Sequence, residues 1–368
     1  MKKFVALLLA AMMLLSVTAI ASADEEMRVA MITDVGTITD QSFNQTTYEA
    51  AKAWCDENGV DFTYYQPATD TDADRIAMID KAVDEGYNVI LMPGYKFGPA
   101  IGGVQEEYSD IKFIALDVGE GDLGGAQLGP NVYCAVYQEE LCGYMAGYAA
   151  VKLGYTHLGF LGGMAVPAVI RYGFGFVQGV NQAAVDMGIA DQVTVEYAYG
   201  NQFFGDADIT GVMDTWYQSL GVQVVFACGG GIYTSAAEAA QKVENGKVIG
   251  VDVDQSAIID GTYGEGMTVT SAMKGLGATV KTLLSEIKAG NFAAFGGKVE
   301  TLGLVGENPE DNYVGIPADT TQFVEGVFGP NDYLALVAAM FAGDVQVSNA
   351  IDAMPAVTVT VNDRGKIK

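Results

Sequence analysis

The sequence predicts an α/β protein built from two successive units, each a parallel sheet flanked by helices. Short apolar runs alternate with longer amphipathic segments from Arg28 onward, which is the pattern of βαβ units. This pattern restarts near Gly154 without a Pro-rich or Ser-rich linker. The chain has 368 residues, of which 50% are hydrophobic and 18% are charged, so it is long and apolar enough to bury two domain cores.

In the first unit, four apolar runs are separated by segments with helical periodicity. The expected strands are Arg28–Thr33, Asp61–Tyr65, Asn88–Met92 and Lys112–Leu116. The expected helices are Gln45–Glu57, Asp72–Glu85 and Pro99–Tyr108. Because strands and helices alternate, the strands should be parallel and the helices should cover both faces of the sheet.

A long helix, Glu139–Leu153, precedes the second unit, which repeats the same alternation. Its expected strands are His157–Leu161, Val193–Tyr197, Val222–Ala227 and Lys247–Val251. The helices between them are about Ala168–Met187, Asp208–Ser219 and Ser235–Val243. Beyond these we expect a helix over Ser271–Ala289, an irregular Gly-rich tail and a helix near Tyr333–Ala342.

The two units should be lobes of one molecule joined by short hinges. We expect residues 24–153 with about 271–296 to form the first lobe. Residues 154–270 with about 297–368 should form the second lobe. The hinge between the lobes is then where relative movement is expected.

The first residues have the features of a secretory signal peptide. Lys2–Lys3 are followed by the apolar run Phe4–Leu15 and by the small residues Ala21–Ala23, which are the three parts of such a segment. Cleavage is expected before Asp24. No later stretch has the roughly 18 unbroken apolar residues that a spanning helix needs. We therefore expect an exported protein of the periplasm or cell envelope.

The charge balance excludes two classes of partner. The net charge is −27, from 19 basic and 46 acidic residues. Removing residues 1–23, which contain two lysines and no acid, takes it from −27 to −29. Such a surface repels phosphate groups, so neither nucleic acid nor an anionic membrane is an expected partner.

No motif points to a metal or a cofactor. There is one histidine, His157, placed at the start of an expected strand, where we expect a structural role. The sequence has no C-x-x-C, no phosphate-binding loop and no nucleophile elbow. The cysteines are far apart and mostly inside expected helices or strands, so we expect buried thiols: Cys55, Cys134, Cys142 and Cys228.

Carboxylates and glycines follow the expected strands at their carboxyl ends. In open parallel sheets ligands bind at this edge. The residues placed there are Asp34, Pro93–Gly94, Asp117, Gly162–Gly163, Gly229–Gly231 and Asp252. Each could instead cap a helix or permit a turn, but three aspartates at equivalent positions favour a binding site.

The residue types at this edge indicate the class of ligand. Carboxylates accept hydrogen bonds strongly and therefore favour hydroxyl or amine donors. The chain has only four arginines, so an arginine cluster that clamps phosphate is not expected. Gly229–Gly231 should allow the backbone to approach a neutral ligand closely. The ligand should be neutral or cationic and rich in donors.

Three segments resemble a known family. The segments ITDVGTITDQSFNQ (32–45), RYGFGFVQG (171–179), and GVDVDQ (250–255) with TSAMKG (270–275) are similar to the basic-membrane-protein family. Its members are solute-binding proteins, the purine-nucleoside receptors of ABC importers. The resemblance runs from about Arg28 to about Gly315. It implies a type I periplasmic-binding-protein fold, in which two α/β lobes close on the ligand.

The family pattern implies the residues that hold the base. It places Asp34, Phe43 and Asn44 on the base from one lobe, and an aromatic of the segment GNQFFGD on its other face. We choose Phe204, with the neighbouring Phe203 as the alternative. Two phenyl rings can sandwich a flat heterocycle, which agrees with this assignment.

The family pattern also implies the residues that hold the ribose. Carboxylates, a lysine and a backbone glycine can together contact sugar hydroxyls. The implied ribose contacts are Asp117, Gly230, Asp252 and Lys274. Many members carry a lipid on a cysteine at the cleavage site, but no cysteine precedes Cys55 here. Anchoring of that kind is therefore not expected.

The resemblance implies a binding protein and not an enzyme. We expect a monomer that captures a nucleoside and delivers it to the membrane permease subunits of an ABC importer, without a cofactor. Two alternatives remain open. An exported nucleoside or sugar hydrolase could use Asp34 and Asp117 as a carboxylate pair, and a sensory receptor of the same fold could report to a signalling partner.

Overall fold

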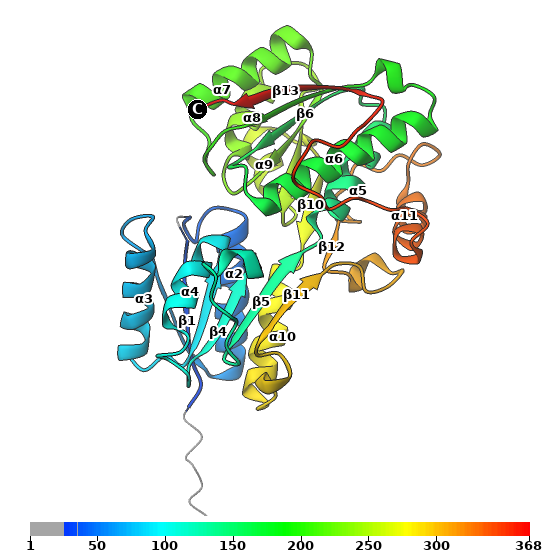
Figure 1. Cartoon of the computed structure of the whole chain (residues 1–368). Coiled ribbons are helices and arrows are strands. Elements are labelled where there is room, and N and C mark those ends of the chain that lie inside the picture. The colour runs from blue at the N-terminus through cyan, green and yellow to red at the C-terminus, as the bar shows by residue number, and fades with distance from the viewer. Residues whose placement is uncertain (1–25, 35) are drawn as a thin grey trace, which may run out of the picture.

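The structure is a computed structural model that describes residues 26–34 and 36–368. The expected signal peptide and its cleavage site before Asp24 lie outside the described residues. The chain forms two lobes, with the N-terminal part in one and the C-terminal strand in the other (Figure 1). Within the described part, no helix has the length and apolar character that crossing a membrane requires.

The first lobe is a parallel sheet of six strands in the order β11-β5-β4-β3-β1-β2. Four of the strands are those expected: β1 (Arg28–Ile32), β2 (Asp61–Tyr65), β3 (Val89–Pro93) and β4 (Lys112–Leu116). Two were not anticipated: β5 (Val132–Tyr137) and β11 (Lys298–Leu302). The helices of this lobe are α2 (Phe43–Asn58), α3 (Asp72–Asp84), α4 (Gly98–Val104) and α10 (Leu276–Lys288).

The second lobe is a sheet of seven strands in the order β12-β10-β9-β8-β6-β7-β13. All pairs are parallel except β10 with β12. The strands are β6 (His157–Gly162), β7 (Thr194–Tyr199), β8 (Val224–Cys228), β9 (Lys247–Asp252), β10 (Thr268–Lys274), β12 (Val314–Gly315) and β13 (Thr360–Lys366). Its helices are α5 (Glu139–Lys152), α6 (Pro167–Asp186), α7 (Ala207–Asp214), α8 (Tyr233–Ala240), α9 (Ser256–Tyr263) and α11 (Pro330–Ala342).

The chain crosses between the lobes at different residues from those expected. It leaves the first lobe after β5, because α5 packs against α6 and β10 of the second sheet. It returns between β10 and α10, and it leaves again after β11. The expected helix over Ser271–Ala289 is therefore wrong at its start. Ser271–Lys274 complete a buried strand, and the helix begins only at Leu276.

Helices α5 and α6 lie in backbone contact, which explains the glycines of the RYGFGFVQG segment. A Cβ at Gly175 would lie 2.1 Å from the carbonyl oxygen of Glu140. From the other side, a Cβ at Gly143 would lie 2.3 Å from the carbonyl oxygen of Tyr172. Any side chain at these positions would push the helices apart. This close approach brings the first turn of α5 beside the first turns of α6.

The cysteines and the histidine have the structural positions that were expected. All four cysteines are buried and free. His157 begins β6, and its Nε2 lies 3.4 Å from Oε1 of Glu196 on the neighbouring strand β7. Burial raises the pKa of all four thiols, to about 12 in Cys55 and Cys134, which disfavours the reactive thiolate form.

Candidate functional site

A cavity of about 900 Å³ lies between the lobes and is lined by residues of both. Its walls come from the loops that follow β1, β3 and β4 in the first lobe. In the second lobe they come from the ends of β6 to β10 and the start of α6. The carboxyl ends of both sheets thus face one space, as the strand-end pattern predicted. All eight predicted site residues line it: Asp34, Phe43, Asn44, Asp117, Phe204, Gly230, Asp252 and Lys274.

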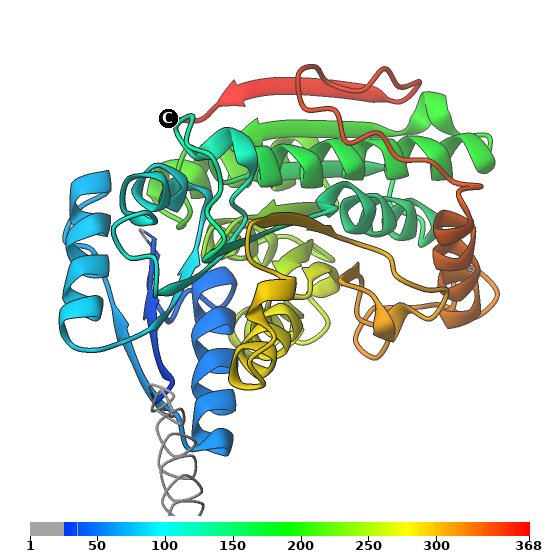
Figure 2. The same cartoon turned by 60° about the horizontal axis from the view of Figure 1, so that its bottom comes forward.

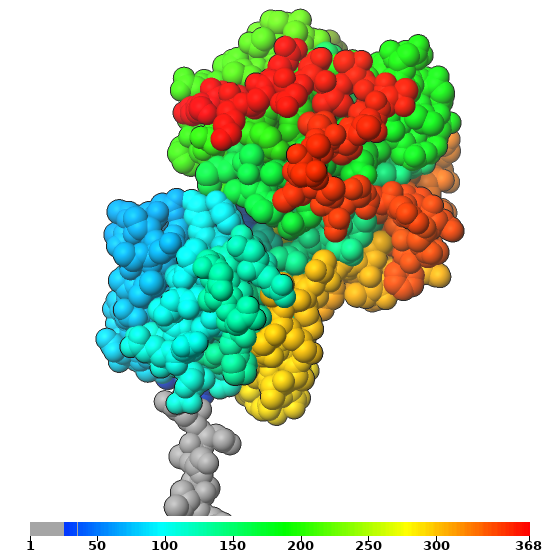
Figure 3. Space-filling model, viewed as in Figure 1, coloured from blue at the N-terminus to red at the C-terminus, as the bar shows by residue number. Residues whose placement is uncertain are grey.

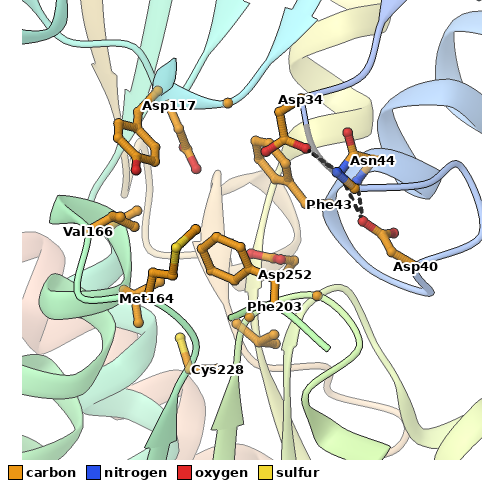
Figure 4. A pocket seen from close by; sticks show the side chains of 18 of the residues that line it. Asp34, Asp40, Phe43, Asn44, Asp117, Met164, Val166, Phe203, Cys228 and Asp252 are labelled. Carbon is orange, nitrogen blue, oxygen red and sulfur yellow. Dashed lines mark hydrogen bonds between the residues drawn. The ribbon is translucent and has the colours of Figure 1, made fainter. Parts of the chain in front are cut away.

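The first lobe contributes a hydrogen-bonded cluster at the start of α2. The Nδ2 atom of Asn44 donates to Oδ1 of Asp34 at 3.2 Å and to Oδ2 of Asp40 at 3.1 Å (Figure 4). Asp40 also accepts the backbone N–H groups of Ser42, Asn44 and Gln45, so it caps the helix. The Oδ1 atom of Asn44 is buried and accepts no hydrogen bond from the described residues.

Asp117 and Lys274 form an ion pair that joins the two lobes. Asp117 follows β4 with a φ of 60°, a strained left-handed conformation that turns its side chain toward the cavity wall. Its Oδ2 atom accepts from Nζ of Lys274 at 2.5 Å. Its Oδ1 atom is buried without a partner among the described residues. One acceptor is therefore available to a ligand while the other is held by the lysine.

Asp252 makes a second connection between the lobes. It ends β9 with a φ of 66°. Its Oδ2 atom accepts from Oγ of Ser42 in the first lobe at 2.6 Å, and its Oδ1 atom accepts from the Tyr172 hydroxyl at 3.3 Å. Burial raises the pKa of Asp252, while nearby Lys274 and the Ser42 hydroxyl act in the opposite direction.

Lys274 is almost fully buried at the end of β10. Its Nζ lies 3.7 Å from Oδ1 of Asp252 and 3.5 Å from Oε1 of Glu139, in addition to the Asp117 contact. It also lies 4.7 Å from the centre of the Phe43 ring. Burial alone lowers the pKa of Lys274, but the three carboxylates outweigh it and raise the pKa overall. The ammonium therefore stays charged at neutral pH.

Sequence reasoning missed a buried ion pair behind this lysine. Nε of Arg171 donates to Oε2 of Glu139 at 2.6 Å, and Arg171 also lines the cavity. Glu139 is fully buried, which raises its pKa, although Arg171 and Lys274 oppose that effect. Arg171 opens the RYGFGFVQG segment, so its position in that motif was a usable signal. Nothing in the sequence marked Glu139 as its partner.

The two adjacent phenylalanines of the second lobe differ in packing. The Phe203 ring covers the glycines at the ends of β6 and β8, since a Cβ at Gly163 or Gly229 would lie within 2.8 Å of it. Phe204 is 61% exposed. Both line the cavity, and Figure 4 shows Phe203 beside Asp252 and across the cavity from Asp117. Packing thus favours the alternative, Phe203, over Phe204 as the ordered aromatic wall.

The remaining wall is apolar and was not anticipated. Met164 and Val166 follow β6, and Cys228 ends β8 (Figure 4). Apolar residues near a strand end resemble core residues in sequence, so no pattern distinguishes them. They give the cavity an apolar side in addition to its carboxylates, which is typical of a pocket for a small organic ligand.

This arrangement of two lobes and a shared cavity agrees with the comparison with known families. The family model for "ABC transporter substrate-binding protein PnrA-like" matches residues 27–326. The chain belongs to this family. The match covers both lobes and every predicted site residue.

Characterised relatives support the same assignment. The nucleoside-binding protein BmpA of an ABC transporter in Lactococcus lactis is 27% identical over 297 residues, covering 76% of this chain and 79% of the relative. The CD4+ T-cell-stimulating antigen of Listeria monocytogenes is 31% identical over 292 residues, covering 75% and 77%. Basic membrane protein B of Borreliella burgdorferi is 27% identical and covers 81% and 83%.

Solved structures establish the fold class. An ABC transporter solute-binding protein of Aeropyrum pernix superposes with a TM-score of 0.66 at 22% identity, covering 88% of this chain and 87% of that one. A solute-binding protein of Conexibacter woesei gives a TM-score of 0.65 at 22% identity, covering 88% and 99%. The chain has the type I periplasmic-binding-protein fold, as the sequence predicted.

Proposed function

We propose that this protein is the extracytoplasmic receptor of an ABC importer and that it binds a nucleoside, above all a purine nucleoside, between its lobes. The observation that carries the proposal is the cavity between the strand ends, with a phenylalanine from each lobe and buried acceptors without partners. The name of the Lactococcus relative, a nucleoside-binding protein, supports the same ligand class. The signal-like segment at residues 1–23 supports export.

We assign the base to the first-lobe cluster and the aromatic walls. Asp34 and Asn44 present oxygen acceptors, and the free Oδ1 of Asn44 fits a donor on the edge of the base. Phe43 would stack on one face of the base. Phe203 or Phe204 would cover the other face, and the better packing of Phe203 favours it.

We assign the ribose to the buried charged residues at the lobe interface. The unpartnered Oδ1 of Asp117 can accept a sugar hydroxyl while Lys274 holds the other oxygen. Asp252 lies on the opposite lobe within reach of the same lysine. Gly230, with a φ of 51°, would let the backbone approach the ligand.

Charge around the cavity favours a nucleoside over a nucleotide. Among the described residues, six aspartates and three cationic side chains line the cavity, and each of these cations already contacts a carboxylate. The aspartates are Asp34, Asp40, Asp70, Asp117, Asp122 and Asp252. A phosphate would therefore meet net negative charge, with no unpaired cation in the described part of the cavity wall to receive it.

The test has two steps. Mass spectrometry of small molecules released from the denatured, purified protein should identify a nucleoside. Thermal unfolding should then show that adenosine, guanosine or inosine raises the melting temperature, whereas the matching 5′-monophosphate does so much less. Equal stabilisation by both forms would contradict the proposed ligand class. Unchanged nucleoside after prolonged incubation would support binding without turnover, as expected for a receptor that acts as a monomer with a permease.

A further inference from the structure

The last part of the chain lies beyond the region shared with the family and reaches back to the binding site. The family match ends at residue 326. After α11, the chain crosses the outer face of the second lobe over α6 and returns as β13, drawn in red (Figures 1 and 3). Figure 2 shows β13 lying along the edge of the second sheet. Its final residues approach the loop that carries Phe203.

β13 completes the sheet beside the strand that leads into the site. It pairs in parallel with β7, from Thr360 opposite Thr194 to Lys366 opposite Tyr199. The N–H of Ile367 then donates to the carbonyl oxygen of Tyr199 at 2.8 Å, at the last residue of β7. Without this pairing β7 would be an edge strand with unpaired backbone groups. The loop 200–206, which follows directly, carries Phe203.

Side chains also fasten β13 to β7. Glu196 of β7 is almost fully buried. Its Oε1 atom accepts from Nδ2 of Asn362 at 2.8 Å, and its Oε2 atom accepts from Nε of Arg364 at 2.7 Å. These contacts hold the first part of β13 against β7. After Asp363 the register shifts, so that Lys366 lies opposite Tyr199, and the chain then brings Lys368 to the far end of the loop.

Lys368 forms an ion pair with Asp206 at that far end. Asp206 caps the N-terminus of α7, where its Oδ1 atom accepts the N–H groups of Asp208 and Ile209. Its Oδ2 atom also accepts from Nε2 of Gln202 at 2.8 Å. The hydrogen bond from Lys368 is the main reason that the pKa of Asp206 is lowered to about 2. Asp206 thus connects three parts of the lobe by hydrogen bonds: Lys368, the start of α7 and the loop 200–206.

The loop between these two fixed points sets the position of the aromatic wall. Its first residue, Gly200, is held to β6 by a backbone hydrogen bond to Gly162. In its middle, the Phe203 carbonyl accepts the N–H of Gly231 at 2.9 Å, which fixes the ring over the glycines of β6 and β8. The Gln202 side chain, next to Phe203, is hydrogen-bonded to Asp206, so movement at Asp206 would disturb the loop beside the ring.

We propose that β13 and Lys368 are positioning elements of the binding site, which hold the loop 200–206 so that Phe203 is in place before the ligand arrives. The ion pair between Lys368 and Asp206 is the final restraint. An ordered wall lowers the conformational entropy lost on binding. The affinity part of the test depends on the proposed function, so the experiment includes a measurement made without ligand.

The test compares Lys368→Met with Lys366→Met, which removes the same charge from an exposed position at the end of β13, two residues earlier. In the ligand-free protein, Lys368→Met should speed amide hydrogen exchange in residues 200–206 by roughly two- to fivefold, the range expected for an exposed ion pair. Affinity for adenosine and for guanosine should fall by roughly the same factor. Lys366→Met should change neither, and Lys368→Arg should preserve both.

A double-mutant cycle tests whether Lys368 acts through Phe203. In a Phe203→Ala background, Lys368→Met should cause no further loss of affinity. If Lys368→Met lowers affinity as much in that background as in the unsubstituted protein, Lys368 does not act through Phe203. If Lys368→Met leaves amide exchange in residues 200–206 unchanged, the proposal itself is wrong. A third outcome separates this proposal from the proposed function. If Lys368→Met exchanges faster but the unsubstituted protein binds neither nucleoside, the restraint on the loop is supported and the proposed function is contradicted. Raising the salt to 1 M should reproduce the Lys368→Met exchange rates in the unsubstituted protein, because it screens the ion pair.

Discussion

The two lobes build their halves of the cavity in different ways. In the first lobe, Asp34, Asp40 and Asn44 lie within one short segment and hold one another by hydrogen bonds. In the second lobe, Asp252 and Lys274 end different strands, and both are almost fully buried. The first half-site is therefore a local structure formed by neighbouring residues. The second half-site depends on the packing of the whole lobe.

This difference has an electrostatic consequence. The buried acids of the second lobe have raised pKa values, because burial disfavours the charged carboxylate in Asp252, Glu139 and Glu140. Lys274 and Arg171 offset part of that cost. We therefore expect charge substitutions and pH to act on the stability of the second lobe, and aromatic substitutions to act on ligand affinity from both lobes.

The largest effect is expected from Lys274→Met. The substitution leaves Asp117, Asp252 and Glu139 without the cation that they share, so the free energy of unfolding should fall by about 3–5 kcal/mol. Urea unfolding of the ligand-free protein measures this change. Lys281→Met, on the exposed side of α10, should change stability by less than about 0.5 kcal/mol. Equal losses of unfolding free energy in both variants would show that the buried charges of the second lobe do not contribute specially to stability.

The second effect concerns Glu140, on the first turn of α5. Burial raises the pKa of Glu140 from 4.5 to about 7, and its Oε2 has no partner among the described residues. Between these values the folded protein holds a proton that the unfolded chain has released, so stability falls as the pH rises. Glu140→Gln should remove the part of this decline that Glu140 causes, and it should be more stable than the unsubstituted protein by about 1–3 kcal/mol above pH 7.

Unfolding measured across pH 4 to 8 tests that expectation. Glu244→Gln, at an exposed position of the same lobe, is the matched control and should keep the decline. A decline that persists unchanged in Glu140→Gln would contradict this assignment and point to the other buried acids of the second lobe, Glu139 and Asp252.

The third effect compares the aromatic residues of the two lobes. Phe43→Ala and Phe203→Ala should each weaken nucleoside binding by about 1–3 kcal/mol, since each removes one stacking face. Phe204→Ala is the control, because the Phe204 residue is 61% exposed. It should reduce the free energy of nucleoside binding by less than about 0.5 kcal/mol. Titration calorimetry measures the affinities. Loss of binding in Phe204→Ala alone would show that the exposed ring turns inward on the ligand.

The smallest effect is expected at the contact between the lobes. Ser42→Ala removes the 2.6 Å hydrogen bond from the first lobe to Asp252 of the second. The contact between the lobes should be weakened by about 0.5–1.5 kcal/mol, so affinity for the ligand should fall modestly. Ser285→Ala, which breaks a contact inside the first lobe, should leave affinity unchanged. An equal loss of affinity in both variants would argue against a specific role for the contact between the lobes.

Sequence patterns were sufficient where the deciding interactions are local. The eight segments assigned to strands all occur as strands. Most are continuous apolar runs, which a buried parallel strand needs, whereas β2 is a partly exposed edge strand. The positions of Asp34, Asp117 and Asp252 around one cavity also followed from the sequence. Parallel strands bring their carboxyl ends to a common edge, so the residue after each run could be placed without knowing the fold in detail.

Only the tertiary structure decided the interactions between distant segments. Lys298–Leu302 has polar residues and is only partly buried, and it becomes a strand of the first sheet only because β5 offers an edge. Residues 271–274 belong to a strand and not to the following helix for the same reason. The pairing of Arg171 with Glu139, and the approach of Lys368 to Asp206, depend on the packing of helices and on strand order. Such contacts join residues far apart in the chain, and periodicity within a segment contains no information about them.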